Sequence, residues 1–322
     1  MEFKNVFFFF KGRTSIPLQW NWREGSLNAR VSIAQNSIRN GIFLPPQGRP
    51  SIIRQWRSNW REGLKEVWTI QLCTIALLMH SGLLFSQSSL DKTIDLFNHR
   101  HEKANGLIAD STHINKCISA FESEIRKGNV TEKCALYYLL SLNFKVRFVY
   151  TNEKQKRNLL DRTIELSEMY MKKFPSFGPI LFEYITSVGL KAELTGAFAN
   201  ATNGVVEKMR KSSLKLIQLD SMYYSCTGWK VLGILNYKTP YIPLIIDWPS
   251  KTEAKKVLEK ALKYFPTDIA NNFYYAEALK ENNETEKARI YFNLVLKLKK
   301  RENAVLEDLD FQARAKEHLK SL

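Results

Sequence analysis

The chain has 322 residues, with 48 Lys and Arg against 32 Asp and Glu, which gives a formal net charge of +16. A charge excess of this size suits nucleic acid, an acidic membrane surface or an acidic protein as partner. Its distribution argues against nucleic acid, because residues 1–87 carry +7 while the +9 of residues 88–322 is interspersed with acids, as on a solvated helix face.

The first recognisable segment is residues 67–85, an apolar run without Lys, Arg, Asp or Glu that follows several basic residues and precedes a polar stretch. A basic flank, an apolar run and a polar exit are typical of a secretory signal peptide, and the length also approaches that of a membrane-spanning helix. Both interpretations place residues 88–322 outside the cytoplasm. We therefore expect a protein that is exported to the periplasm, or anchored on the outer side of the inner membrane by a tether at residues 67–85. A buried helix of a soluble protein is the alternative.

Residues 1–66 precede this run and lack sustained hydrophobic periodicity. We interpret them as a disordered or mis-annotated N-terminal extension, with an organelle transit peptide as the alternative because the segment is rich in Arg and Ser and poor in acids. The predicted organisation is an extension at 1–66, a signal peptide or membrane anchor at 67–87, and one helical-repeat domain at 88–322.

Five consecutive segments after residue 110 have apolar residues at spacings of three and four, which is the period of an amphipathic helix. Their members are Ile114, Ile118, Phe121 and Ile125; Ala135, Leu139, Leu142 and Val146; Leu160, Ile164, Met171 and Phe174; Phe182, Ile185 and Leu190; and Val205, Met209, Leu216 and Leu219. Gly128, Pro175 and Asp220 are stop signals, and Pro179 suits the first position of a helix. No segment alternates polar and apolar residues as a half-buried strand would, so the predicted fold is all-α, built from antiparallel helix pairs.

A repeat of 34 residues follows, since Ala254, Leu258 and Ala261 recur as Ala288, Phe292 and Val295. Thirty-four residues is the period of the tetratricopeptide (TPR) unit, in which small residues let two helices approach closely. We therefore expect helix pairs stacked as a TPR-like superhelical solenoid, with residues 269–301 as the most regular unit.

The preceding unit is interrupted. Gly233 lies 21 residues before Ala254, whereas the equivalent Ala276 lies only 12 residues before Ala288, so nine residues are inserted between its two helices. The insertion belongs to residues 237–249, where three prolines forbid a continuous helix.

This part of the chain resembles the TPR-like proteins associated with tripartite ATP-independent periplasmic (TRAP) transporters. The resemblance covers residues 225–310 and rests on the segments GWKVLG at 228–233 and NYK at 236–238, on Pro240, IP at 242–243, WPS at 248–250 and Ala254, and on KAL at 260–262 with Pro266. It implies an exported, all-helical protein without catalytic activity. It also implies that the protein binds a partner protein, such as a periplasmic solute-binding or transporter component, a small ligand, or both. The concave face or an enclosed channel of the solenoid would take a partner peptide or an apolar ligand.

Five residues in and beside the insertion are the candidate binding residues: Trp229, Lys230, Tyr237, Tyr241 and Trp248. Rigid aromatic side chains on preorganised loops are common binding anchors. The alternative is a loop that covers an apolar end of the stack, with Ile242, Leu244, Ile245 and Ile246 buried beneath it.

The sequence lacks the phosphate-loop, zinc-protease, nucleophile-elbow and paired-cysteine motifs, so we predict neither an enzyme nor a cofactor or metal site. A membrane-tethered adaptor and a hydrolase-type enzyme with a cleft of scattered acids are the alternatives. Several carboxylates of shifted pKa in one pocket would favour the enzyme, and an aromatic, apolar pocket would favour binding. Cys117, Cys134 and Cys226 match no metal or redox spacing, and a bridge between Cys117 and Cys134 is an alternative to buried thiols.

Overall fold

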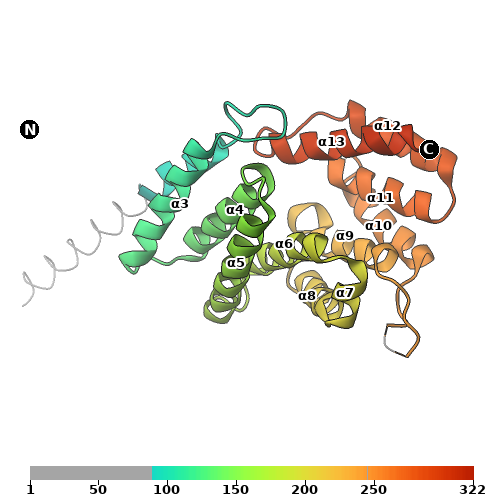
Figure 1. Ribbon diagram of the computed structural model, residues 1–322, viewed down its shortest axis with the longest axis horizontal. Helices are drawn as coiled ribbons and strands as arrows, with labels where there is room; N and C mark the ends of the chain where they lie inside the picture. Colours follow the sequence, from blue (N-terminus) through green and yellow to red (C-terminus); the bar gives the residue numbers. More distant parts are fainter. Residues whose placement is uncertain (1–88, 245) are drawn as a thin grey trace, which may run out of the picture. The chain divides into compact units, whose positions relative to one another are not determined.

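The computed structural model describes residues 89–244 and 246–322, which belong to one compact unit, residues 80–322. The predictions for residues 1–66 and 67–87 lie outside this description. The helices are residues 89–98, α3 (Ser111–Arg126), α4 (Glu132–Phe148), α5 (Glu153–Lys173), α6 (Gly178–Thr195), α7 (Ala197–Thr202), α8 (Val205–Leu219), α9 (Tyr223–Lys238), α10 (Lys251–Tyr264), α11 (Ile269–Glu281), α12 (Thr285–Lys297) and α13 (Val305–Lys320) (Figure 1). The described ranges contain no β-strand, and the prediction of an all-α helical-repeat fold is confirmed.

Polar side chains at the helix starts explain where many of these helices begin. The N-terminal N–H groups of a helix have no partner within it, and an oxygen-bearing side chain just before the first turn accepts from one of them. The residues that do so are Asp110 for α3, Thr131 for α4, Asn152 for α5, Ser250 for α10 and Asp268 for α11. Helix α6 instead begins with Pro179 in its first turn, as predicted.

Consecutive helices pack against each other as pairs, including α3 with α4, α5 with α6, α9 with α10 and α11 with α12. The residues of the 34-residue repeat form the contact surfaces, because Ala254, Leu258, Ala261, Ala288, Phe292 and Val295 are all fully buried. Helices α9 and α10 come very close together at Gly233 of α9, where an added Cβ would lie 2.4 Å from Cγ of Leu258 on α10. The repeat therefore marks real helix-to-helix contacts.

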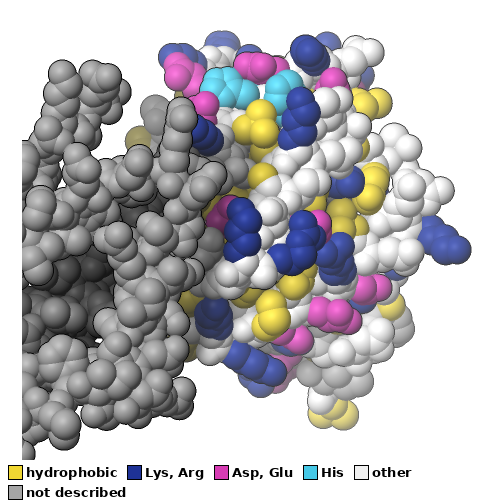
Figure 2. All heavy atoms as spheres, turned by 90° about the vertical axis from the view of Figure 1, so that its left-hand side faces the viewer, with side chains coloured by type: hydrophobic (Ala, Val, Ile, Leu, Met, Phe, Trp, Pro, Cys, Tyr) yellow, Lys and Arg dark blue, Asp and Glu magenta, His cyan; other side chains and the backbone are white. Residues whose placement is uncertain are grey.

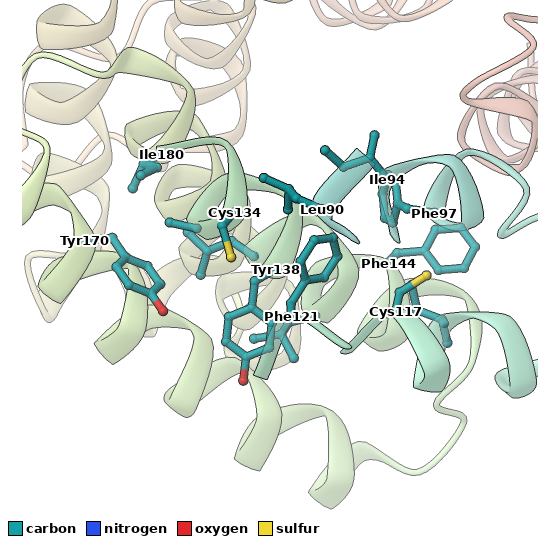
Figure 3. Close-up of a cluster of buried hydrophobic side chains, with 14 of the residues drawn as sticks. Leu90, Ile94, Phe97, Cys117, Phe121, Cys134, Tyr138, Phe144, Tyr170 and Ile180 are labelled. Carbon is teal, nitrogen blue, oxygen red and sulfur yellow. The ribbon is translucent and has the colours of Figure 1, made fainter. Parts of the chain in front are cut away.

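The N-terminal helices enclose a core cluster that contains Phe121 and Tyr138 (Figure 3). Cys117 and Cys134 are both buried in this cluster as free thiols, and their sulfur atoms point to different parts of it in Figure 3. Burial raises the pKa of each thiol to about 11, so both are protonated at neutral pH. They act as small apolar core residues.

The buried face of α5 differs from the predicted stripe. Its fully buried residues are Leu160, Thr163, Ser167 and Tyr170, whereas Ile164 and Met171 are only partly buried. The hydroxyl of Thr163 donates to the carbonyl of Leu159 (2.6 Å) and that of Ser167 to the carbonyl of Thr163 (2.7 Å). With their hydroxyls satisfied within the helix, these small side chains can face a neighbouring helix at little cost.

Helix α13 contributes to two core clusters. Its first turn places Leu306, which is 1% exposed, in the N-terminal cluster, while Phe311 and Ala315 belong to the cluster around α11 and α12. Two ion pairs accompany this contact, Arg100–Glu307 (2.7 Å) and Arg147–Asp310 (3.1 Å). The C-terminal helix thus joins the beginning of the described chain to its end.

No helix within the described ranges is both long and apolar enough to cross a membrane.

Candidate binding site

The five candidate residues lie on α9 and on the connection from α9 to α10, and the structure brings only two of them together. Tyr237 and Tyr241 line one surface cavity of about 410 Å³. Its full lining is Asn236, Tyr237, Lys238, Thr239, Pro240, Tyr241, Pro249, Lys251 and Glu281. Trp229, Lys230 and Trp248 are not part of this lining.

The cavity has one fixed wall and one exposed wall. The hydroxyl of Tyr237 donates to Glu277 on α11 at 2.6 Å, which holds its ring between α9 and α11. Tyr241 is 62% exposed. Lys251, the first residue of α10, forms an ion pair with Glu281 at 2.8 Å across the cavity. The walls therefore combine aromatic faces, proline rings, the Lys251–Glu281 ion pair and Lys238.

The connection beyond the cavity is a short hairpin. Ile242 and Ile246 exchange two backbone hydrogen bonds of 3.0 and 2.8 Å, and Ile246 is buried at the hairpin base. Leu244 at the tip is completely exposed and has a φ of +67°, in the left-handed region. The alternative in which the loop buries its apolar residues therefore holds for Ile246 and fails for Leu244. Ile245 lies outside the described residues.

Trp248 anchors the far end of this connection. Its ring packs on the cluster around α6 and α8, with the guanidinium of Arg210 at 5.0 Å from the ring centre. The amide oxygen of Asn236 accepts from the backbone N–H of Ser250 at 3.2 Å and ties the end of the loop to α9. These contacts give Trp248 a structural role at the base of the loop.

The two remaining candidates face other parts of the molecule. Trp229 is partly buried, and the ammonium group of Lys260 on α10 lies 4.8 Å from the centre of its ring. Lys230 is buried, donates to the carbonyl oxygen of Tyr224 at 3.3 Å and lies 3.7 Å from the carboxylate of Asp268. Burial lowers the pKa of Lys230, and Asp268 opposes that change.

The bonds of Lys230 support an unusual turn at the start of α9. Tyr224, Ser225 and Cys226 all have left-handed backbone angles, with φ of 43°, 57° and 62°. Each such residue costs about 1–2 kcal/mol when it is not glycine. The carbonyl of Tyr224 accepts from Lys230 and from the hydroxyl of Thr227 (3.1 Å), and these bonds offset part of the cost.

The turn directs two adjacent tyrosine rings onto one phenylalanine. The ring of Phe182 on α6 lies 5.9 Å from that of Tyr223 and 5.6 Å from that of Tyr224. Tyr224 remains 45% exposed. Neither tyrosine was among the candidate residues. The tyrosine pair is visible in the sequence three residues after the Asp220 stop, but nothing there predicts three left-handed residues without glycine.

Glu183 follows Phe182 on α6 and is 2% exposed. Its carboxylate accepts from the side-chain amide of Asn143 at 2.9 Å, and Ser187 donates to the same Asn143 side chain at 2.8 Å. Burial raises the pKa of Glu183 to about 7, although the Asn143 bond and Arg147 oppose that change. No motif or spacing in the sequence singled out this glutamate.

Basic and acidic side chains are mixed over the described part of the face seen in Figure 2. Many charged groups of the described residues form ion pairs, such as Lys133–Asp91 at 3.0 Å and Lys208–Glu168 at 2.8 Å. Among the described residues, no three His, Cys, Asp or Glu side chains are placed to hold a metal ion.

A comparison with protein-family models finds no matching family, and a comparison with curated protein sequences finds no match. The functional interpretation therefore depends on the residues and geometry described above.

Proposed function

We propose that this protein is a non-catalytic, exported helical-repeat binding protein of the TPR type. It engages a partner protein through the hairpin that interrupts the α9–α10 unit, and takes a small apolar ligand in addition. One observation carries the proposal: Leu244 projects fully exposed from a hairpin whose base is buried, beside a cavity with Tyr241 at its rim.

The hairpin has the features of a preorganised binding element. Pro240, Pro243 and Pro249 restrict its backbone, and the paired hydrogen bonds between Ile242 and Ile246 fix its two arms. A rigid loop loses little conformational entropy on binding, so more of the contact energy is available as affinity. An apolar tip that the rest of the chain leaves uncovered gains most when a partner removes it from water.

The lining of the hairpin cavity favours binding over a hydrolase-type reaction. It contains one carboxyl group, Glu281, which pairs with Lys251, and the buried Glu183 with its raised pKa does not belong to it. General acid–base chemistry on paired carboxylates needs two such groups at one site.

The cellular role follows from the N-terminal apolar run and the resemblance to TRAP-associated TPR proteins. Residues 67–85 direct export and are cleaved, or stay as a membrane tether in the adaptor form of the same proposal. The partner is then a periplasmic solute-binding or transporter component. Cell fractionation with antibodies against residues 88–322 separates the two forms, and recovery of the protein in the cytoplasm would overturn both.

The partner-binding role is tested by affinity capture of the tagged full-length protein from its native host, followed by mass spectrometry. Tyr241→Ala and Leu244→Asp should each reduce recovery of the partner about tenfold or more, the usual effect of removing a central contact. Matched controls are Tyr264→Ala and Ile290→Asp, since these side chains are 59% and 64% exposed away from the hairpin. Equal loss in the controls, or no partner recovered by the unaltered protein, would contradict the proposal.

A further inference from the structure

The C-terminal ends of α5, α8, α10 and α12 all carry exposed lysines. The last five residues of each of these helices contain no Asp or Glu, and the chain adds further lysines directly after α12. The exposed lysines are Lys172 and Lys173 on α5, Lys215 on α8, Lys260 and Lys263 on α10, Lys297 on α12, and Lys299 and Lys300 beyond it. We call these four helix ends, with their lysines, the lysine edge.

The ends of α5 and α8 are brought together by the start of α6. Helix α6 begins at Gly178, shortly after α5 ends, and an added Cβ there would lie 3.2 Å from Cδ1 of Leu216 in the last turn of α8. The end of α8 also packs on the start of α9, where an added Cβ at Gly228 would lie 2.7 Å from Cγ1 of Ile217. The lysines of α5 and α8 therefore belong to one side of the packed helices.

The start of α9 continues this edge to α10 and α12. The ammonium group of Lys260 on α10 lies 4.8 Å from the ring centre of Trp229 on α9. Arg301, just after α12, lies 5.3 Å from the ring centre of Tyr224 at the start of α9. The same Arg301 lies 3.9 Å from the carboxylate of Asp268, which caps α11 soon after α10 ends. All four lysine-bearing ends therefore gather around the start of α9.

The opposite ends of the same helices are balanced in charge. Each helix has a glutamate in its first turn that lies close to a cation: Arg157–Glu153 at 2.5 Å, Arg210–Glu207 at 3.6 Å, Lys256–Glu253 at 3.8 Å and Arg289–Glu286 at 3.8 Å. At the lysine edge, Lys299 lies 3.8 Å from Glu302, and the other lysines form no ion pair with a described acid. The helix dipole favours a cation at each C-terminus, and the packing of the helices then collects these cations on one side.

The kind of side chain at this edge favours a lipid surface over an acidic protein. Lysine is depleted in protein interfaces, where arginine is favoured, and the guanidinium of Arg301 is already bound to Asp308 at 2.6 Å. Lysine side chains can instead lie along apolar surface while their ammonium groups reach lipid phosphates. Large apolar side chains are exposed between the lysines: Met169, Leu219, Met222, Tyr264 and Leu296.

We propose that the lysine edge binds the surface of a membrane that contains anionic lipids. The ammonium groups contact the lipid phosphates, and the exposed apolar side chains enter the interface between headgroups and acyl chains. The hairpin lies at the other ends of these helices, since it connects the end of α9 to the start of α10. It therefore faces away from the lipid and stays accessible to a partner protein, and neither interaction requires the other.

The test is co-sedimentation of the full-length protein with vesicles of phosphatidylcholine, with and without phosphatidylglycerol. The apolar run at 67–85 contributes to binding of both kinds of vesicle, so the difference between them measures the effect of lipid charge. Binding should be about tenfold or more tighter to the vesicles that contain phosphatidylglycerol. This preference should shrink as the salt concentration is raised from about 0.1 M to about 0.5 M.

Two quadruple variants separate the lysine edge from the net charge. The edge variant combines Lys172→Gln, Lys215→Gln, Lys263→Gln and Lys297→Gln, and should bind anionic vesicles about tenfold or more weakly than the parent. The control variant combines Lys154→Gln, Lys208→Gln, Lys256→Gln and Lys287→Gln, which lie toward the starts of the same helices and remove the same charge. It should bind like the parent. Equal losses in the two variants, an undiminished edge variant, or a parent without preference for anionic vesicles would each overturn the proposal.

Affinity capture of the partner with the edge variant distinguishes lipid from an acidic protein. Circular dichroism first confirms that both quadruple variants are folded. The edge variant should capture the partner as the parent does, whereas Tyr241→Ala should lose the partner and keep its vesicle binding. An edge variant that loses the partner and keeps its vesicle binding would assign the lysine edge to an acidic protein and overturn the lipid proposal.

Discussion

Glu183 shows at the level of one residue how burial sets a charge state. Burial raises its pKa from 4.5 to about 7 in the folded protein, while the unfolded chain keeps the lower value. Ionisation therefore favours the unfolded state as the pH rises from about 4.5 to about 7, and stability falls over this range. Glu183→Gln removes that loss. The variant should be more stable than the parent by about 3 kcal/mol at pH 8 and equally stable at pH 4.

Urea denaturation at the two pH values measures this difference. The matched control is Glu317→Gln, which alters a largely exposed carboxyl group near the end of α13 and should not show a gain at pH 8. An equal gain for Glu183→Gln at both pH values would mean that packing, rather than ionisation, explains the result.

Lys230 shows what the sequence could and could not predict about single residues. Its place in the GWKVLG segment was visible in the sequence, and so was its position on a helix. Its partners were not, because the carbonyl of Tyr224 is reached through a left-handed turn and Asp268 belongs to another repeat. Long-range partners of a charged side chain depend on how the helices stack, which periodicity does not encode.

At the scale of elements, the close contact of α9 with α10 depends on Gly233. An added Cβ would meet all the terminal carbons of Leu258 within 2.8 Å, so Gly233→Ala should destabilise the protein by about 1–3 kcal/mol. Gly189→Ala is the matched control, because its Cβ would meet only the flexible end of Met209 at 3.4 Å. That change should be neutral or stabilising by up to about 1 kcal/mol through helix propensity.

Thermal or urea unfolding distinguishes the two glycines. The loss in the double variant Gly233→Ala/Leu258→Ala should be smaller than the sum of the two single losses, since Leu258→Ala removes the atoms that the new Cβ meets. Strictly additive losses would place the cost of Gly233→Ala elsewhere in the repeat.

The left-handed turn at the start of α9 gives a second prediction at this scale. Ser225 has a φ of 57°, which glycine adopts without strain, so Ser225→Gly should stabilise the protein or leave it unchanged. Ser212→Gly, within the right-handed helix α8, should cost about 0.5–1 kcal/mol. Equal losses in urea denaturation of both variants would contradict a left-handed conformation at Ser225.

Most elements could be predicted because their signals are local. Stop signals, Pro179 and three-four spacing predicted α3, α4, α6 and α8 nearly to their ends. The buried face of α5 could not be predicted, because Thr163 and Ser167 satisfy their own hydroxyls and so occupy positions expected for apolar residues. The candidate site was predicted only in part. The hairpin was visible as a proline-rich insertion, whereas the aromatic group of Phe182, Tyr223 and Tyr224 was not, because its residues come from both α6 and α9.

At the scale of the described unit, α13 connects the first helices to the last ones, and this contact should make them unfold together. Leu306 is buried in the N-terminal cluster although it lies 16 residues before the C-terminus, and two ion pairs reinforce the contact. The Arg147–Asp310 pair is partly exposed and contributes little by itself, and in the largely buried Arg100–Glu307 pair the cost of removing both charges from water offsets much of their attraction. The apolar side chain therefore supplies most of the attachment. The described helices should therefore unfold in one cooperative transition that a change at Leu306 weakens at both ends.

Leu306→Ala should lower the free energy of unfolding by about 2–4 kcal/mol. Hydrogen exchange followed by mass spectrometry should show faster exchange in residues 89–98 and α4, more than 150 residues away in sequence, because the lost methyl groups belong to their core. Leu319→Ala is the control, since Leu319 is partly buried against the α11–α12 cluster and its loss should affect exchange there. Faster exchange confined to α12 and α13 in the Leu306 variant would show that α13 is held by the C-terminal cluster alone.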